Sequence, residues 1–431
     1  MLSASGPMRV FADLQVHSPY SRATSKNMNL KELAKFSSMK GLNIVGTGDF
    51  THPLWRQEAR EVLCEAEPGL YRLEYGSSPI RFMITGEVNT TFLFREKSRR
   101  IHHCVLAPSL ESAEAVGDRL AHYGNLSSDG RPILRATAPE LVDEVLEADG
   151  QCVVFPAHAW TPWFGLFGGR SGFDSLVDCY QDRSSKIFAL ETGMSSDPAM
   201  NWRLSQLDRV CLVSNSDAHS AWPWRVGREA NVFNLERPTY RDIIGAIRDK
   251  DPRRFLFTIE TSPEYGKYHW TGHKDCNVSM AGRDARNVGD KCTKCGKKMI
   301  QGVEERVEEL ADRPAGYVPE NAIGYRHLLP LSEIIALLIG GVNPDSTKVW
   351  GIYNGLIGKF GSEYAVMLDV PEDQLTATVG LEISNAIIRV RRDEIYVDPG
   401  YDGVYGKLDF TKQVPSKTFG GSKPEMLASW T

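Results

Sequence analysis

Histidine and carboxylate side chains recur through the first half of the sequence in a pattern that suits metal binding. The sharpest motif is Asp217-Ala218-His219, in which one small residue separates two candidate ligands. In an extended chain both side chains would point to the same side. Gln15-Val16-His17 has the same spacing, with an amide in the first position. His, Asp and Glu form the ligand sets of Zn²⁺, Mn²⁺ and iron sites, so the pattern predicts a metal centre.

The candidate ligands outnumber what one ion needs. They are Gln15, His17, Asp49, His52, Glu87, His102 or His103, His158, Glu191, Asp217 and His219. His102 and His103 would point to opposite faces of a strand, and we favour His102 as the ligand. Clustered ions suit phosphate ester hydrolysis, because they provide hydroxide at neutral pH and hold both the attacking and the leaving oxygen. We therefore predict a metal-dependent phosphoesterase with Asp217, His219, Glu87 and Glu191 in catalytic roles.

Seven short apolar runs would carry these residues as buried strands. They cover residues 9–17, 42–50, 80–88, 100–107, 151–158, 186–193 and 210–219. Most candidates close a run, whereas His102 and His103 lie near the start of the fourth. Helical patterns at 29–40, 139–148 and 239–249 lie between runs, and the first begins with a capping box. Alternating strands and helices predict parallel strands in a barrel, with the ligands converging on one face.

The chain has 431 residues, 42% hydrophobic and 24% charged, with a formal net charge of -5. We predict a catalytic barrel at 1–262, a zinc-binding segment at 263–302 and a mostly helical domain at 303–431, which has helical patterns at 303–310 and 331–338. No apolar run is long enough for a membrane span, and the first ten residues lack a signal-peptide pattern. Five of the eight cysteines lie singly in mostly apolar runs, which suits a reducing cytoplasm.

A second metal site is predicted where the other three cysteines cluster. His273, Cys276, Cys292 and Cys295 form two ligand pairs of x-x spacing that would fill a tetrahedral zinc site, which would then be structural. His269 is an alternative to His273, and a redox dithiol is the alternative for the Cys292–Cys295 pair.

Two features could serve DNA. Residues 267–298 contain eight Lys or Arg against three Asp, a concentration that suggests contact with a phosphate backbone, although a solvated face is the alternative. Aromatic residues crowd the loops after His158 and His219, where they would either stack on a flipped base or close the mouth of the barrel. The candidate DNA-binding and base-binding residues are Arg22, Trp160, Trp163, Phe167, Arg170, Trp222, Arg225, Lys274 and Lys297.

The order of these motifs resembles the PHP (polymerase and histidinol phosphatase) superfamily. That resemblance implies a distorted (β/α)7 barrel with a trinuclear metal site, ligated by His17, Asp49 or His52, Glu87, His102, His158, Asp217 and His219. The sequence departs from the family twice, because the first motif has Gln15 where the family has His, and Phe50 follows Asp49 where the family has His.

A closer resemblance, to the endonuclease Q family, extends over nearly the whole chain. It rests on residues 18–25 (SPYSRATS), 45–53 (VGTGDFTHP), 307–313 (VEELADR) and 399–406 (PGYDGVYG). The resemblance implies a DNA repair endonuclease that cuts 5′ of deaminated bases (uracil, hypoxanthine, xanthine) and abasic sites by metal-activated hydroxide, leaving a 3′-hydroxyl and a 5′-phosphate. Zn²⁺ would fill the structural site and serve catalysis, with Mg²⁺ or Mn²⁺ as catalytic alternatives. Damaged DNA is the implied partner, and a sliding clamp a further one.

Two other functions are compatible with the motifs. The first is a small-molecule phosphatase of the PHP type, for which the zinc segment, the basic cluster and the C-terminal region would be unnecessary. The second is a DNA-binding scaffold whose PHP barrel has lost activity, which Gln15 in place of His makes conceivable. The metal content separates them, because an inactive barrel should hold fewer than two ions besides the structural zinc.

Overall fold

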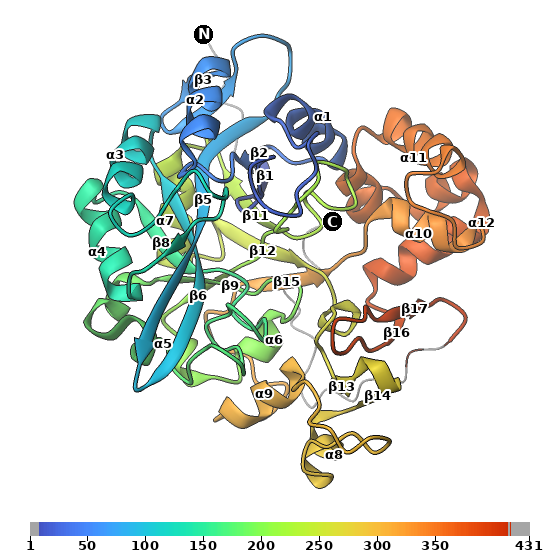
Figure 1. Cartoon of the computed structure of the whole chain (residues 1–431). Coiled ribbons are helices and arrows are strands. Elements are labelled where there is room, and N and C mark those ends of the chain that lie inside the picture. Colours follow the sequence, from blue (N-terminus) through green and yellow to red (C-terminus); the bar gives the residue numbers. More distant parts are fainter. Residues whose placement is uncertain (1–7, 413, 415–431) are drawn as a thin grey trace.

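The seven predicted runs all form strands, five of them in one large sheet and two in a separate pair, and together they make a barrel (Figure 1). A computed structural model describes residues 8–412 and 414. Residues 1–7 and the residues near Thr431, where a sliding clamp could bind the chain, lie outside the described residues. The seven strands are β1 (Met8–Asp13), β2 (Ile44–Gly46), β5 (Arg81–Phe94), β6 (Lys97–Ala107), β8 (Val153–Pro156), β9 (Ala189–Glu191) and β10 (Cys211–Val213).

These strands form a closed ring. β1, β2 and β5 pair in parallel, β6 joins β5 to β8, and β9 pairs with β10. Beyond the strand ends, Ala159 N–H donates to Glu191 O at 3.0 Å, which connects β8 to β9. A parallel bridge between Val16 and Ala218 connects β10 back to β1. The α/β class and the PHP-type barrel are therefore confirmed.

Strand direction corrects one expectation. β6 runs antiparallel to both β5 and β8, so it alone opposes the direction of the other six. The start of β6 therefore lies at the same face as the ends of its neighbours. This explains why the histidines come early in the predicted run at 100–107 while the other candidates close theirs. In the structure β6 begins at Lys97, so His102 lies in the middle of the strand, paired with Asn89 of β5.

Further strands extend and decorate the sheet. β11 (Ala230–Leu235), β12 (Phe255–Glu260) and β15 (Gly324–His327) continue it beyond β1, and β3 (Leu63–Glu67), β4 (Leu70–Leu73) and β7 (Ile133–Leu134) attach at β5. Separate hairpins are β13 (Thr271–His273) with β14 (Val278–Met280) and β16 (Tyr396–Asp398) with β17 (Lys407–Asp409). The division of the chain at 262 and 302 stays a prediction, and β15, from the third part, pairs with β12 of the first.

Helices cover the outside of the barrel. They are α1 (Leu30–Lys40), α2 (Pro53–Val62), α3 (Leu110–Leu120), α4 (Ala138–Ala148), α5 (Leu176–Tyr180), α6 (Pro198–Asn201) and α7 (Tyr240–Asp249). The predicted helix at 29–40 is confirmed, since the Asn29 side chain accepts hydrogen bonds from the N–H groups of Lys31 and Glu32 and Gly41 ends the helix at φ 99°. Among the described residues, the structure contains no helix with the length and apolarity to cross a membrane.

The C-terminal region packs against α1 as a helical layer (Figure 1). It contains α10 (Leu331–Leu338), α11 (Thr347–Phe360) and α12 (Glu372–Arg391), while α8 (Gly282–Asn287) and α9 (Val303–Leu310) accompany the β13–β14 hairpin. Trp350 of α11 lies against Phe36 of α1 and against Trp222 and Trp224, which follow β10.

A buried ion pair joins this helical layer to the barrel. The Lys40 ammonium lies 2.7 Å from Glu363 Oε1 and donates to Pro223 O at 2.9 Å. The two side chains are 3% and 1% exposed. Glu363 also accepts hydrogen bonds from Leu331 N–H and the Tyr353 hydroxyl. One buried lysine thus holds α1, the loop after Asp217 and the helical layer together.

Replacing Lys40 by Met should destabilise the protein by about 3–5 kcal/mol, because Glu363 would be left as an uncompensated buried charge. Lys40→Met combined with Glu363→Leu should cost less than the single change. Urea unfolding of the two variants, with exposed Lys35→Met on α1 as a control, measures both effects. A loss for Lys40→Met no larger than for Lys35→Met would show that the pair contributes nothing.

Candidate metal centre

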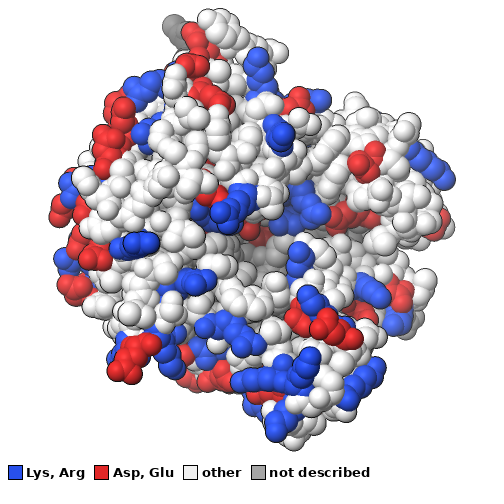
Figure 2. Space-filling model, in the orientation of Figure 1, with Lys and Arg blue, Asp and Glu red and all other residues white. Residues whose placement is uncertain are grey.

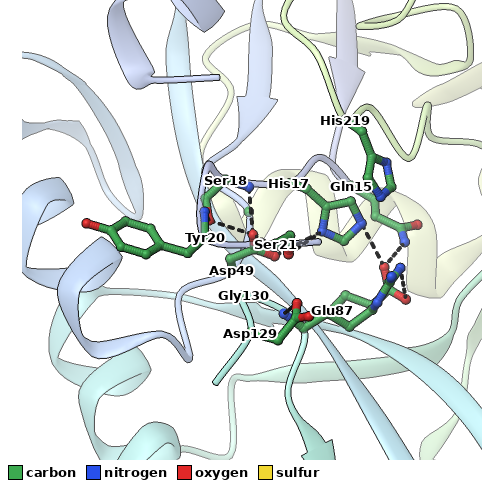
Figure 3. Close-up of polar contacts among 12 residues, drawn as sticks. Gln15, His17, Ser18, Tyr20, Ser21, Asp49, Glu87, Asp129, Gly130 and His219 are labelled. Atoms are coloured by element: carbon green, nitrogen blue, oxygen red, sulfur yellow. Dashed lines mark hydrogen bonds and ion pairs between the residues drawn. The ribbon is translucent and has the colours of Figure 1, made fainter. Parts of the chain in front are cut away.

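The end of the barrel gathers several of the predicted ligands into one network of polar contacts, among them Gln15, His17, Asp49 and Glu87 (Figure 3). Those it brings together as potential ligand groups are His17, Asp217 and His219 in one set and Glu87, His102 and His158 in another. Within each set the ligand atoms lie within 4.8 Å of one another. Both sets consist of imidazole nitrogens and carboxylate oxygens, a donor chemistry that fits Zn²⁺, Mn²⁺ or iron.

In the first set His17 lies between the carboxylates of Asp49 and Asp217. Its Nε2 is 2.8 Å from Asp217 Oδ1, and its ring centroid is 4.3 Å from that of His219. Asp217 has φ 48°, a left-handed conformation that a side chain adopts at a cost. The parallel bridge between Val16 and Ala218 brings the two x-spaced motifs side by side. This register explains why two motifs 200 residues apart supply one set of ligands.

In the second set Glu87 accepts from two imidazoles. Glu87 Oε1 lies 2.5 Å from His102 Nδ1 and 3.4 Å from His158 Nε2. Burial lowers the pKa of His102 to about 4, which leaves the ring neutral as a metal ligand must be. His103 points away, with its two nitrogens 2.8 Å from the Thr90 and Tyr180 hydroxyls. Of the two adjacent histidines, the structure places His102 in the site.

Glu87 connects the two sets. Its second oxygen, Oε2, is 3.1 Å from His17 Nε2 and accepts from Gln15 Nε2 at 2.7 Å. Burial raises the pKa of Glu87, but Arg131 and His102 hold it well below its ordinary value overall. Gln15 Oε1 is buried and has no hydrogen-bond partner among the described residues. An unpaired buried acceptor of this kind suits a cation, which supports the prediction of Gln15 among the ligands.

Asp49 holds His17 from behind. Its Oδ1 is 3.0 Å from His17 Nδ1, and its Oδ2 accepts from Ser18 N–H, the Ser18 hydroxyl and the Ser21 hydroxyl. Asp49 therefore orients His17, as carboxylates behind metal-binding histidines do, and because it lies outside both sets its place as a direct ligand stays a prediction. His52, the alternative at this motif, stacks on Tyr20 with ring centroids 4.2 Å apart and lies outside both sets.

Glu191 also lies behind the ligands. Its two oxygens accept from His158 N–H and from Asn215 Nδ2, each at 2.7 Å. Burial raises the pKa of Glu191 to about 8. Glu191 thus positions His158, whose φ of 29° requires a firmly held backbone, and its catalytic role stays a prediction.

Arg131 is a site residue that the sequence analysis missed. It is half-buried in the loop between α3 and α4, and its Nη1 lies 3.6 Å from Glu87 Oε1. Burial lowers the pKa of the guanidinium, but Glu87, Asp217 and Asp49 together raise it above its ordinary value. The one available signal was the turn sequence Ser128-Asp129-Gly130-Arg131-Pro132, which is not attached to any strand run.

The four predicted zinc ligands come together in the β13–β14 hairpin region. His273, Cys276, Cys292 and Cys295 offer ligand atoms within 4.8 Å of one another. Cys295 Sγ is 3.6 Å from His273 Nδ1. The alternative ligand His269 is outside this set. The three thiols and one imidazole match a closed structural zinc site.

The aromatic residues after His158 divide into two groups. Trp160 and Phe167 are buried in the core, where Trp160 Nε1 donates to Asn201 Oδ1 at 2.8 Å. Their predicted contact with DNA is therefore wrong, because both rings are buried in the core and cannot reach a base. Trp163 is 39% exposed and packs edge-on against Tyr268. Trp222 is 37% exposed and stacks on Trp224 at 4.9 Å.

Basic side chains surround a hollow on the face of the molecule shown in Figure 2, and acidic residues line part of its floor. Of the predicted DNA-binding residues, Arg22, Arg170, Lys274 and Lys297 are exposed and Arg225 is half-buried. Arg22 also pairs with Asp129, its Nε 3.2 Å from Asp129 Oδ2. The contact of these cations with DNA stays a prediction.

Comparison with known proteins identifies relatives along the whole chain. The model of the MJ0043 C-terminal domain family matches residues 330–394. Uncharacterized protein MJ0043 of Methanocaldococcus jannaschii is 33% identical over 265 residues, which is 59% of this chain and 32% of that protein, so the match spans about a third of that relative's length. Uncharacterized protein YqxK of Bacillus subtilis is 28% identical over 422 residues, 93% of this chain and 99% of that protein.

Two solved structures match almost end to end. The lesion-specific endonuclease PfuEndoQ from Pyrococcus furiosus is 32% identical with a TM-score of 0.83, and the match covers 98% of this chain and 99% of that one. Endonuclease Q in complex with a 27-mer duplex substrate that has an abasic lesion at the active site is 33% identical, also with a TM-score of 0.83, over 96% of this chain and 98% of that one.

Replacing Cys292 by Ala should remove one bound metal ion per chain and destabilise the hairpin segment, because three ligands bind a structural zinc far more weakly than four. Metal analysis by mass spectrometry and thermal unfolding measure the two effects. Cys64→Ala, at a cysteine outside all the ligand sets, is the control. An unchanged metal content in the Cys292 variant would exclude the site.

Proposed function

The chain belongs to the endonuclease Q family, and we propose that it cuts DNA 5′ of deaminated bases (uracil, hypoxanthine and xanthine) and of abasic sites. The products would carry a 3′-hydroxyl and a 5′-phosphate. One observation carries the proposal: Glu87 connects two sets of metal-type ligands in a chain that matches a lesion-specific endonuclease over 98% of its length. A metal-dependent phosphodiesterase acting on DNA is the enzyme class that this combination supports.

The protein's own contribution is to hold its ligands in fixed positions. Ions held by the two sets would supply hydroxide at neutral pH and neutralise charge on the phosphate. Asp49 fixes the His17 ring so that Nε2 faces Asp217 and Glu87. Glu191 fixes the backbone of His158 in its left-handed conformation. Because the supporting carboxylates are buried, the ligands are arranged before substrate arrives.

Substrate binding would use the rim of the hollow. Arg22, Arg170, Lys274 and Lys297 are exposed cations suited to the phosphate backbone. The partly exposed rings of Trp163 and Trp222 are suited to stacking on a base taken out of the duplex. We also propose a sliding clamp as a further partner.

The two alternative functions receive less support. A small-molecule phosphatase would not need the exposed cations or the zinc hairpin, which extend well beyond the ligand sets. An inactive scaffold would have no reason to keep Glu87 buried between three histidines. Each alternative nevertheless predicts a different experimental result.

The deciding experiment incubates metal-loaded protein with end-labelled duplexes that contain uracil, hypoxanthine, xanthine or an abasic site. We expect a single nick 5′ of each lesion and none in the undamaged duplex. Asp217→Asn should slow the nicking at least about 100-fold, because it removes the charge of a carboxylate that belongs to the same ligand set as His17. Duplex binding should stay intact. Asp118→Asn, at an exposed position on α3, is the matched control.

Hydrolysis of a small phosphomonoester without nicking of any duplex would identify the phosphatase instead. Duplex binding with fewer than two ions besides the zinc, and without nicking, would identify the scaffold. A wild-type nicking rate in Asp217→Asn would remove Asp217 from the metal site.

A further inference from the structure

The loop between α3 and α4 reaches across the open end of the barrel and is held there at several points. Gly130 N–H donates to Tyr20 O and Arg131 N–H to Asp129 Oδ1, each at 3.0 Å. Asn89 N–H donates to Pro132 O at 3.0 Å, and β7 pairs with β5 directly after it. The loop is therefore fixed against β5 and against the segment after β1 that carries His17.

Gly130 allows the loop to come this close. A Cβ atom at this position would lie 2.3 Å from Asp49 Oδ2 and 2.4 Å from the Ser21 hydroxyl oxygen. Any larger residue would displace either the loop or the carboxylate that orients His17. The close approach brings the next residue, Arg131, over the ligand sets (Figure 3 shows Asp129 and Gly130 beside Glu87).

The Arg131 guanidinium is incompletely used by the protein. Its side chain is 22% exposed, and its Nη1 lies 3.6 Å from Glu87 Oε1, beyond hydrogen-bond distance. Within the described chain it makes this one ion pair and no side-chain hydrogen bond. A guanidinium carries five donors, so most of the Arg131 donors make no hydrogen bond within the described chain.

Electrostatics make an anion the natural ligand of these donors. Once the two ligand sets hold divalent ions, the positive charge of Arg131 faces further positive charge across Glu87. An oxyanion between them would relieve this repulsion, and a phosphate group matches the planar fork of a guanidinium. A purely structural arginine at this position would instead use its donors on backbone carbonyls, as Arg391 does with Met367 and Val366.

We propose that Arg131 binds a non-bridging oxygen of the scissile phosphate and stabilises the charge that develops there during cleavage. This inference rests on the proposed function of the site. Hydroxide forms a bond to phosphorus, and the bond from phosphorus to the 3′-oxygen of the preceding nucleotide breaks. That oxygen leaves and takes up a proton to become the 3′-hydroxyl, the phosphate stays on the 5′ side of the lesion nucleotide, and Arg131 keeps its proton throughout. Its role is to bind and to stabilise charge, with Gly130 as the residue that lets it approach.

The test compares single-turnover cleavage of an abasic duplex by wild type, Arg131→Met and Arg131→Lys. We expect the Met variant to be slower by about 100-fold or more, as for the loss of one donor that stabilises transition-state charge. The Lys variant should recover only part of the rate, because an ammonium lacks the fork. Arg135→Met, at an exposed arginine four residues further along, is the matched control and should cleave at the wild-type rate.

Two readouts separate phosphate binding from a structural role. Millimolar guanidinium ion should restore part of the rate of Arg131→Met and leave wild type unchanged. Metal content by mass spectrometry should be equal in all four proteins. A wild-type rate for folded Arg131→Met, or a lost rate that guanidinium does not restore, overturns the inference while leaving the endonuclease activity established.

If wild type nicks no lesion duplex, the proposed function fails first. The same variants are then assayed on bis(p-nitrophenyl) phosphate, a phosphodiester without a base. A guanidinium-rescued loss in Arg131→Met supports the inference on that substrate. Equal rates in wild type and variant, or no hydrolysis by wild type, overturn it.

Discussion

One buried carboxylate sets the arrangement of the candidate site. Glu87 lies 1% exposed in the middle of β5 and has contacts with His17 and Gln15 through one oxygen and with His102 and His158 through the other. A charge in this position is tolerated only while positive or polar groups surround it. Strands from both sides of β5 must therefore bring such groups to the same point. The convergence of the ligands follows from the burial of this one side chain.

A second layer of polar groups fixes the first. Asp49 and Glu191 contact His17 and His158 from behind, and each is itself fully occupied by hydroxyl, amide or backbone donors. In sequence they are indistinguishable from ligands, because a supporting carboxylate and a coordinating one both follow the end of a strand. Only their hydrogen bonds in the folded chain separate the two roles.

The parts of the fold that were predictable from sequence are those governed by local pattern. Buried strands bounded by Gly or Pro and helices with clear caps, such as Asn29 before α1, produce short-range signals. The reversed direction of β6 left only an indirect trace, the early position of His102 in its run. The burial of Trp160 was not predictable, because a ring in a loop carries no sign of whether it faces the core or the solvent.

Two features could not be assigned from the sequence, because they depend on contacts between distant segments. Arg131 comes close to Glu87 only because Gly130, which has no side chain, lets the loop pack directly against Asp49. Lys40 looked like an ordinary basic residue in the last turn of a helix, a position that cations favour. Its actual partner, Glu363, lies 323 positions away along the chain.

The Lys40–Glu363 pair also bears on how the protein can change over time. The two charges neutralise each other at the junction of barrel and helical layer, where Lys40 also holds the carbonyl of Pro223 in the loop after His219. A helical layer acquired from another source would fit this junction only if it brought a carboxylate to the same place. The barrel and the helical layer therefore fit together only when both charges are present at the junction. It favours their inheritance as a unit and makes their exchange by recombination unproductive.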